Sequence, residues 1–146
     1  MKIALVTHGT RGDAQPFAAL GLALIARGHE VKLAVPPNLI AFVRKCGIEA
    51  GKIGIDSQAF MESEEGRKWL ASGNVSAFMK RMSAIAHAHL DEIIDDYSRV
   101  FASADLIVAG ILTEDAAAVF AERRGIPLVA LHLAPLRATS AFPNCL

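Results

Sequence analysis

Hydrophobic residues along the chain gather into short apolar runs that are separated by stretches with helical spacing. The runs cover residues 2–7, 30–35, 48–55, 105–109 and 126–133. Continuous apolar runs of this length are typical of strands that are buried on both faces, as in a parallel sheet. We therefore expect five strands, of which 48–55 is the weakest because Gly51 and Gly54 interrupt it.

The segments between these runs predict helices over residues 16–26, 38–46, 74–102 and 113–124. Proline, asparagine and glycine residues stand near their ends, as is typical of helix starts and stops. Residues 57–72 are polar and charged around a few apolar positions, which indicates a loop with one short helix. Strands that alternate with helices predict an α/β fold: a Rossmann-like, doubly wound parallel sheet with helices on both faces.

The strand order expected for such a sheet is 3-2-1-4-5, with its switch point between the first and fourth strands. Ligands of these sheets bind outside the carboxyl ends of the strands at that point. The loops at 8–14 and 110–115 should converge there, and the loop at 132–142 should lie beside them. Candidate site residues on these loops are His8, Gly110, Ile111, Asp115 and His132.

The first of these loops has the sequence H-G-T-R-G-D-A. Its spacing differs from the dinucleotide fingerprint G-x-G-x-x-G, and Asp13 would bring a carboxylate to a bound pyrophosphate. A small nucleotide- or flavin-binding protein is therefore disfavoured. Thr10 offers a hydroxyl and Arg11 a guanidinium that is suited to phosphate. Asp13 is equally well explained as an acid that the helix dipole favours in a first turn.

Composition narrows the class of protein. The chain has 146 residues, 53% of them hydrophobic, which is enough for one domain with a core. Fifteen basic and fifteen acidic residues cancel without blocks of like charge, which disfavours nucleic acid and anionic membranes as partners. No apolar run approaches the ~18 residues of a transmembrane segment and the chain opens directly on a predicted strand, so we expect a cytoplasmic protein. Cys46 and Cys145 have no histidine at metal-ligand spacing, and we expect no metal site.

Three segments near the N-terminus resemble a known family. They read T-H-G-T-R-G-D-A-Q-P at 7–16, A-L-G-L-A-L at 19–24 and R-G-H-E-V at 27–31. They are similar to the N-terminal half of GT-B glycosyltransferases of families 1 and 28, in the group of bacterial antibiotic and sterol glucosyltransferases. The first loop of that group reads G-S/T-R-G-D-x-Q/E-P. Ala134, Pro135 and residues 139–143 are similar to the P-T-x-x-F-P segment of the same family.

The resemblance implies a reaction. Enzymes of this group move a hexose from a nucleotide sugar, such as a UDP- or TDP-sugar, to a hydroxyl of a sterol, lipid or other lipophilic natural product, with inversion. By this resemblance Asp13 is the catalytic general base, and Thr10, Arg11 and Gly12 approach the donor phosphates. For His8 two roles stay open, a base or a residue that shapes the acceptor pocket. No cofactor besides the nucleotide sugar is implied. The acceptor-side candidates are then His8, Gly110, Ile111, Asp115 and His132.

Members of this family are much longer than 146 residues, and their donor-binding C-terminal half has no counterpart in this sequence. We therefore expect residues 1–146 to form an incomplete acceptor-side domain. Without the C-terminal domain this chain should be inactive, because half of the cleft that orients the donor is missing. The alternative is a free-standing binding or interaction module without transferase activity.

Overall fold

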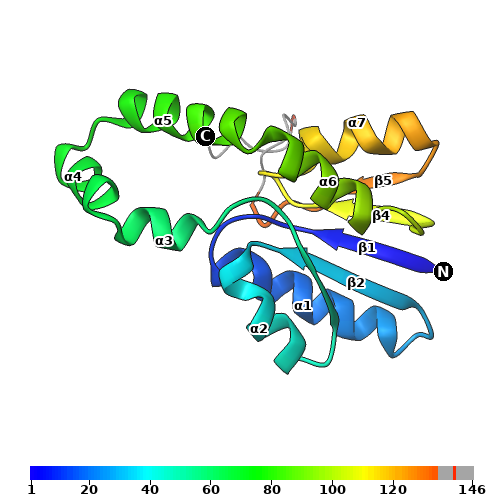
Figure 1. Ribbon diagram of the computed structural model, residues 1–146. Coiled ribbons are helices and arrows are strands. Elements are labelled where there is room, and N and C mark those ends of the chain that lie inside the picture. The colour runs from blue at the N-terminus through cyan, green and yellow to red at the C-terminus, as the bar shows by residue number, and fades with distance from the viewer. Residues whose placement is uncertain (135–139, 141–146) are drawn as a thin grey trace.

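The centre of the fold is a five-stranded parallel sheet in the order β3-β2-β1-β4-β5 (Figure 1). The computed structural model describes residues 1–134 and residue 140. The central strand β1 pairs on both sides, so that Leu5 lies opposite Leu33 and Val108. The predicted fold class and strand order are confirmed. The strands are β1 (Lys2–Val6), β2 (Glu30–Val35), β3 (Glu49–Lys52), β4 (Leu106–Ala109) and β5 (Leu128–Ala130).

Helices cover both faces of this sheet. Helices α1 and α2 lie on one face and α6 and α7 on the other (Figure 1). Helices α3, α4 and α5, which we call the arm, extend from the side where the strands end. No helix of the described residues is long and apolar enough to cross a membrane. The helices are α1 (Arg11–Ile25), the 3-10 turn η1 (Pro37–Leu39), α2 (Ile40–Lys45), α3 (Ser57–Glu62), α4 (Glu64–Ser72), α5 (Val75–Ala88), α6 (Leu90–Val100) and α7 (Glu114–Arg124).

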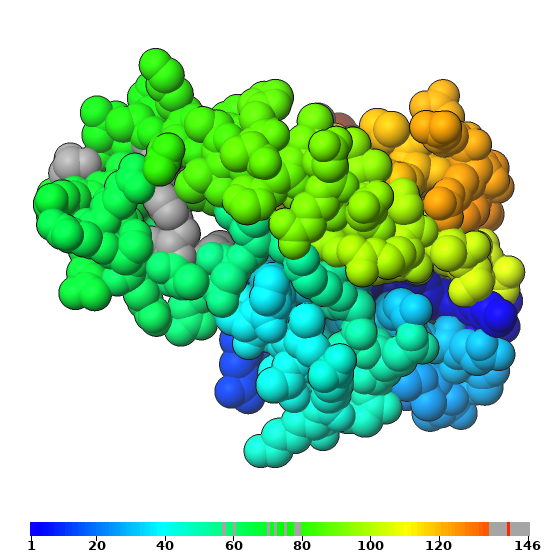
Figure 2. Space-filling model, in the orientation of Figure 1, coloured from blue at the N-terminus to red at the C-terminus, as the bar shows by residue number. Residues whose placement is uncertain are grey.

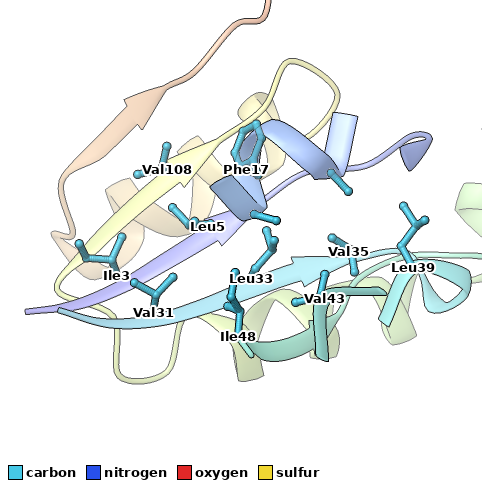
Figure 3. Packing of buried hydrophobic residues seen from close by; sticks show 12 residues of the cluster. Ile3, Leu5, Phe17, Val31, Leu33, Val35, Leu39, Val43, Ile48 and Val108 are labelled. Carbon is cyan, nitrogen blue, oxygen red and sulfur yellow. The ribbon is translucent and has the colours of Figure 1, made fainter. Parts of the chain in front are cut away.

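Each face of the sheet has its own cluster of buried side chains. On the side of α1 and α2, Phe17 packs among strand residues that include Leu5, Leu33 and Val108 (Figure 3). On the side of α6 and α7, the ring of Tyr97 lies 5.6 Å from the rings of both Phe101 and Phe120, measured between centroids. Burial of both faces explains why the strands read as continuous apolar runs.

Helix α1 begins at Arg11, so the predicted start near Pro16 is wrong. Thr10 and Asp13 form a capping box at its N-terminus. The hydroxyl oxygen of Thr10 accepts the N–H of Gly12 at 3.2 Å, and the carboxylate of Asp13 accepts the N–H of Thr10 at 2.7 Å. These side chains satisfy first-turn amides and start the helix upstream of Pro16, which the helix then accommodates.

The single helix predicted over 74–102 is also wrong, because α5 and α6 are separate helices that meet at His89. The backbone of His89 (φ −112°, ψ 18°) departs from helical geometry. The bend directs α6 onto the core, where Tyr97 is buried, while α5 stays in the arm (Figure 1). Residues 57–72 likewise form two short helices rather than one, since the Ser63 side chain accepts the N–H of Gly66 and starts α4 anew.

Candidate functional site

Asp13 lies half-buried in the first turn of α1, just beyond the carboxyl end of β1. Its Oδ2 accepts hydrogen bonds from the backbone N–H of Thr10 at 2.7 Å and from the Thr10 hydroxyl at 3.2 Å. Within the described residues, both hydrogen bonds of the Asp13 side chain end on Oδ2. Asp13 therefore lies in the first turn of α1, as the helix-dipole interpretation expects, and it also caps the helix. Because the cap uses one carboxylate oxygen, it is compatible with a chemical role for the other.

Gly9 makes the close approach of Asp13 possible. Its φ is +128°, and a Cβ at this position would lie 2.4 Å from Asp13 Oδ2. We expect Gly9→Ala to lower the free energy of unfolding by about 1–3 kcal/mol, because a Cβ is strained at this φ and displaces the carboxylate. Urea unfolding measures the loss. Gly28→Ala is the matched control, since Gly28 also has a positive φ, +83°, but nothing lies within 4 Å of its Cβ position. An equal loss for both variants would contradict the contact with Asp13.

A small cavity of about 100 Å³ lies where the loops after β1, β4 and β5 meet. Asp13 and Phe17 of α1 line it together with Gly110 and Ile111, which follow β4, and with Leu131, which follows β5. The loops that sequence reasoning places at the switch point therefore do come together. Two of the predicted residues, Gly110 and Ile111, share this cavity with Asp13.

Thr113 fixes the loop after β4 against the end of β1. Its side chain is 1% exposed, and its Oγ1 lies 3.0 Å from the carbonyl oxygen of Val6 and 2.9 Å from that of Gly110. The N–H of Gly110 also donates to the carbonyl of Val6 at 2.9 Å. A Cβ on Gly110 would lie 2.9 Å from Thr7 Oγ1, so only glycine fits here without movement of the neighbouring chain. The floor of the small cavity is thus rigidly held.

A larger cavity of about 410 Å³ adjoins the small one. Its wall on the side of α5 belongs to the arm, which stands out from the sheet in the space-filling view (Figure 2). Among the described side chains that line it, seven are apolar and three are polar. A cavity of this size with an apolar wall and few polar groups is typical of a site for a small lipophilic molecule. The apolar lining residues are Ile53, Ile55, Met82, Ala86, Ile93, Leu112 and Ala116, and the polar ones are His8, Ser83 and Tyr97.

His8 lines both cavities. Burial lowers the pKa of its imidazole below the usual 6.5, and this effect outweighs the hydrogen bond to the Ile55 backbone and the negative charge of Asp13, which raise the pKa. The ring is therefore neutral at pH 7. It packs against Gly54, where a Cβ would lie 3.3 Å from His8 Cδ2. The position of His8 fits both roles that the sequence left open.

The loop residues expected to approach phosphate lie on the outer side of the loop. Thr10 caps α1, and Gly12 donates its N–H to Thr10. The guanidinium carbon of Arg11 lies 4.9 Å from the centre of the Phe42 ring in α2, a cation–π contact that leaves the charged group exposed. Among the described residues, the linings of the two cavities include none of Thr10, Arg11 and Gly12. Their approach to a donor stays a prediction.

Two acceptor-side candidates lie apart from both cavities. Asp115 is exposed in the first turn of α7. His132 follows β5 and its Nε2 lies 2.6 Å from Oε2 of Glu114, with both side chains largely buried. This pair joins the end of β5 to the start of α7, which is a structural role. Of the C-terminal residues named from the sequence, 135–139 and 141–143 lie outside the described residues.

Sequence reasoning missed the loop after β3 and Ala116 in the first turn of α7, and it did not single out Leu112 on the expected loop at 110–115. Gly54 and Ile55 contact His8 from that loop, and Leu112 and Ala116 line the large cavity. The one signal in the sequence is Gly54, whose φ of +61° forms the tight turn that brings Ile55 to the imidazole. Within the described part of the chain, no three His, Cys, Asp or Glu side chains form a group that could hold a metal ion.

A Rossmann-like sheet with an acid-bearing loop and an apolar cavity at its switch point defines this chain as an α/β ligand-binding domain. Comparison with known families makes the class specific. Residues 3–143 match the model of the glycosyltransferase family 28 N-terminal domain. The chain belongs to this family, as the resemblance in its sequence implied.

Curated relatives include enzymes and proteins that are named only as glycosyltransferases. An uncharacterised glycosyltransferase of Mycobacterium tuberculosis is 40% identical over 147 residues, which cover 98% of this chain and 35% of the relative. The O-mycaminosyltylonolide 6-deoxyallosyltransferase of Streptomyces fradiae is 38% identical over 114 residues, covering 77% of this chain and 27% of that enzyme. A sterol 3-beta-glucosyltransferase of Arabidopsis thaliana is 32% identical over 149 residues, which cover 99% of this chain and 24% of that enzyme. The chain thus spans about a third or less of the length of these relatives.

Solved structures with the same fold are glycosyltransferases. A calicheamicin glycosyltransferase matches with a TM-score of 0.71 and 17% identity, over 97% of this chain and 34% of that one. A second glycosyltransferase, determined in complex with dTDP, matches with a TM-score of 0.63 and 23% identity, over 92% of this chain and 35% of that one. These matches confirm the fold as that of the N-terminal part of GT-B glycosyltransferases.

Proposed function

We propose that the protein containing this chain transfers a hexose from a nucleotide sugar to a hydroxyl of a lipophilic acceptor, and that this domain holds the acceptor. The observation that carries the proposal is the apolar cavity of about 410 Å³ beside the loop that bears Asp13. It can take up the body of a polycyclic or long-chain alcohol, which gains free energy by leaving water. The names of two relatives support this acceptor class, since one is a sterol glucosyltransferase and the other acts on O-mycaminosyltylonolide.

Asp13 acts in this proposal as the general base, and the reaction proceeds with inversion. An alcohol is a weak nucleophile until its proton has an acceptor in the transition state, and an ionised carboxylate at the edge of the cavity supplies one. As the acceptor oxygen bonds to the anomeric carbon, the bond from that carbon to the nucleotide diphosphate breaks with its electron pair. The exposed guanidinium of Arg11 and the N-terminus of α1 are then available to the departing diphosphate.

The donor is a UDP- or TDP-sugar in this proposal, held mainly by a second domain. A solved relative that contains dTDP supports a nucleotide diphosphate of this type. Among the described residues, Thr10, Arg11 and Gly12 line neither of the two cavities, and the donor site is completed by that second domain. Residues 1–146 alone should therefore transfer no sugar.

The direct test incubates the full-length protein with TDP- and UDP-hexoses and with a panel of sterols, hydroxylated lipids, polyketide alcohols and water-soluble sugars. Mass spectrometry should detect lipophilic acceptors that have gained one hexose. Transfer only to the water-soluble sugars would contradict the proposed acceptor class, and no transfer across the whole panel would contradict the enzymatic function.

The cavity also predicts the effect of filling it. Ala86 lines the cavity from α5, so Ala86→Phe should raise the KM for a lipophilic acceptor at least about tenfold, because the added ring takes the space of the acceptor body. The KM for the nucleotide sugar should not change. Ala84→Phe is the matched control, since Ala84 is exposed on the same helix but does not belong to the cavity lining. Equal acceptor KM values for the two variants would place the acceptor elsewhere.

A further inference from the structure

A tyrosine hydroxyl group that the proposed reaction does not use opens on the large cavity. Tyr97 lines this cavity from α6, and only 6% of the residue is exposed. Its hydroxyl group makes no hydrogen bond within the described residues. The described polar side-chain atoms that are both sealed from solvent and without a partner belong to His29, Asn38 and Asp96, so the phenol oxygen is not sealed. It is therefore within reach of a molecule in the cavity.

Two phenylalanine rings hold the ring of Tyr97 in place. Its centroid lies 5.6 Å from the centroids of Phe101 and Phe120, with interplanar angles of 52° and 16°. The rings of Phe101 and Phe120 are in edge-to-face contact with each other, at a centroid distance of 5.9 Å. Phe101 is completely buried, so this aromatic cluster is anchored in the core. The hydroxyl group of Tyr97 thus has a fixed position, and a ligand that binds it need not order the side chain.

The phenol is a hydrogen-bond donor in this position. Burial raises the pKa of Tyr97 to about 12, so the hydroxyl group keeps its proton at neutral pH. A hydroxyl group that is removed from water without a new partner costs free energy, and a hydrogen bond to the ligand offsets this cost. A pure hydrocarbon body in the cavity leaves the phenol unpaired, whereas a body with a suitably placed oxygen atom satisfies it.

The oxygen atom that Tyr97 can bind differs from the one that receives the sugar. In the proposed reaction the reacting hydroxyl group approaches Asp13, which lines the small cavity. Among the described lining residues, Tyr97 belongs to the large cavity alone. The other polar side chains of that cavity are His8, which borders both cavities, and Ser83, which is exposed on α5. Tyr97 is thus the buried polar group that faces the body of the acceptor.

We propose that Tyr97 selects acceptors that carry a second oxygen atom, in a carbonyl, ether or hydroxyl group away from the hydroxyl group that receives the sugar. This inference rests on the proposed function and narrows its acceptor class to lipophilic alcohols with such an oxygen. The residues that line the cavity around Tyr97 include the apolar Ile53, Ile93 and Ala116, so the rest of the molecule can stay apolar. Tyr97 determines specificity in this proposal and takes no part in the transfer step.

The test measures the binding of paired alcohols to the full-length protein by isothermal titration calorimetry, without a sugar donor. The members of each pair share their skeleton and reacting hydroxyl group and differ by one remote oxygen. Epiandrosterone and its analogue without the ketone oxygen form one pair, and a long-chain alcohol with and without a mid-chain ketone forms another. For at least one pair, Tyr97→Phe should weaken the preference for the oxygen-bearing member at least about fivefold, because phenylalanine keeps the ring and loses the donor.

Ser98→Ala is the matched control. It removes a hydroxyl group from the next residue of α6, which lines neither cavity within the described residues, and it should keep the wild-type preference. Tyr97→Phe should also unfold at the same urea concentration as the wild type, because the hydroxyl group has no partner within the described part of the protein. A lower midpoint would show that the hydroxyl group stabilises the fold, which would contradict its being available to a ligand.

Two binding results would overturn this inference. One is an unchanged preference in Tyr97→Phe for every pair that the wild type binds, and the other is a wild type that binds no oxygen-bearing member of any pair. Failure of the proposed function gives a different result. A protein that binds the pairs with the expected preference but transfers no sugar would refute the transferase activity and leave the role of Tyr97 in binding intact.

Discussion

Asp13→Asn in the full-length protein should lower kcat by at least about a hundredfold and leave the fold intact, the usual scale for loss of a general base. The asparagine oxygen can still accept the N–H of Thr10, which Asp13 accepts at 2.7 Å, so the cap of α1 is kept. The charge is lost, and with it the ability to take up the acceptor proton. Initial rates at saturating donor and acceptor measure the effect.

Asp105→Asn is the matched control for this variant. Asp105 Oδ2 also accepts a backbone N–H at 2.7 Å, that of Lys2, but it lies at the opposite end of the sheet, where β4 begins. Asp105→Asn should leave kcat unchanged. Asp13→Asn with near wild-type turnover would remove Asp13 from the reaction as its general base.

Phe17→Ala should lower the free energy of unfolding by about 3–5 kcal/mol, the usual loss for a buried phenylalanine. Phe17 is 1% exposed and packs between α1 and the centre of the sheet (Figure 3). Domains of this size have a total stability of about 5–15 kcal/mol, so the variant would lose much of it. Because Phe17 also lines the small cavity, its removal enlarges the space beside Asp13. Urea unfolding measures the change in stability.

Phe42→Ala is the matched control, because it removes an aromatic ring that is less buried than the ring of Phe17. Phe42 is half-buried beneath the guanidinium of Arg11. Phe42→Ala should therefore lower the free energy of unfolding clearly less than Phe17→Ala does. Phe17→Leu should fall between the wild type and Phe17→Ala, because leucine fills part of the space. Phe17→Ala with a loss below about 1 kcal/mol would contradict the packing of this core.

The sheet could be predicted because its strands are buried on both faces. Residues 2–7 and 105–109 show this burial directly, because they are continuous apolar runs. Parallel strands that are joined by helices can be arranged in only a few strand orders. The switch point follows from the strand order, and Gly110 and Ile111 accordingly lie beside the loop of Asp13. The apolar periodicity begins near Pro16, but α1 starts at Arg11 because Thr10 and Asp13 of the T-x-x-D pattern cap it there.

The large cavity could not be predicted in the same way. Its lining joins His8 to Ile55, Ile93 and Ala116, and each is an ordinary core or surface residue in its own segment. The local hydrophobic periodicity gives no sign of the bend at His89. That bend keeps α5 away from the sheet, where it forms a wall of the large cavity. The family resemblance supplied the chemistry of Asp13 but not its separation from the cavity, which depends on where the ring of His8 lies.

The arm has a consequence for how this domain can diversify. None of the described side chains of α3, α4 and α5 belongs to either buried cluster of the sheet, yet α5 supplies Met82, Ser83 and Ala86 to the large cavity. The part of the cavity wall that α5 supplies is thus separate from the buried clusters that keep the domain folded, whereas Ile53 and Tyr97 belong both to the cavity lining and to a buried cluster. If the cavity holds the acceptor as proposed, exchange of this segment changes the acceptor while the sheet and its acidic loop stay as they are.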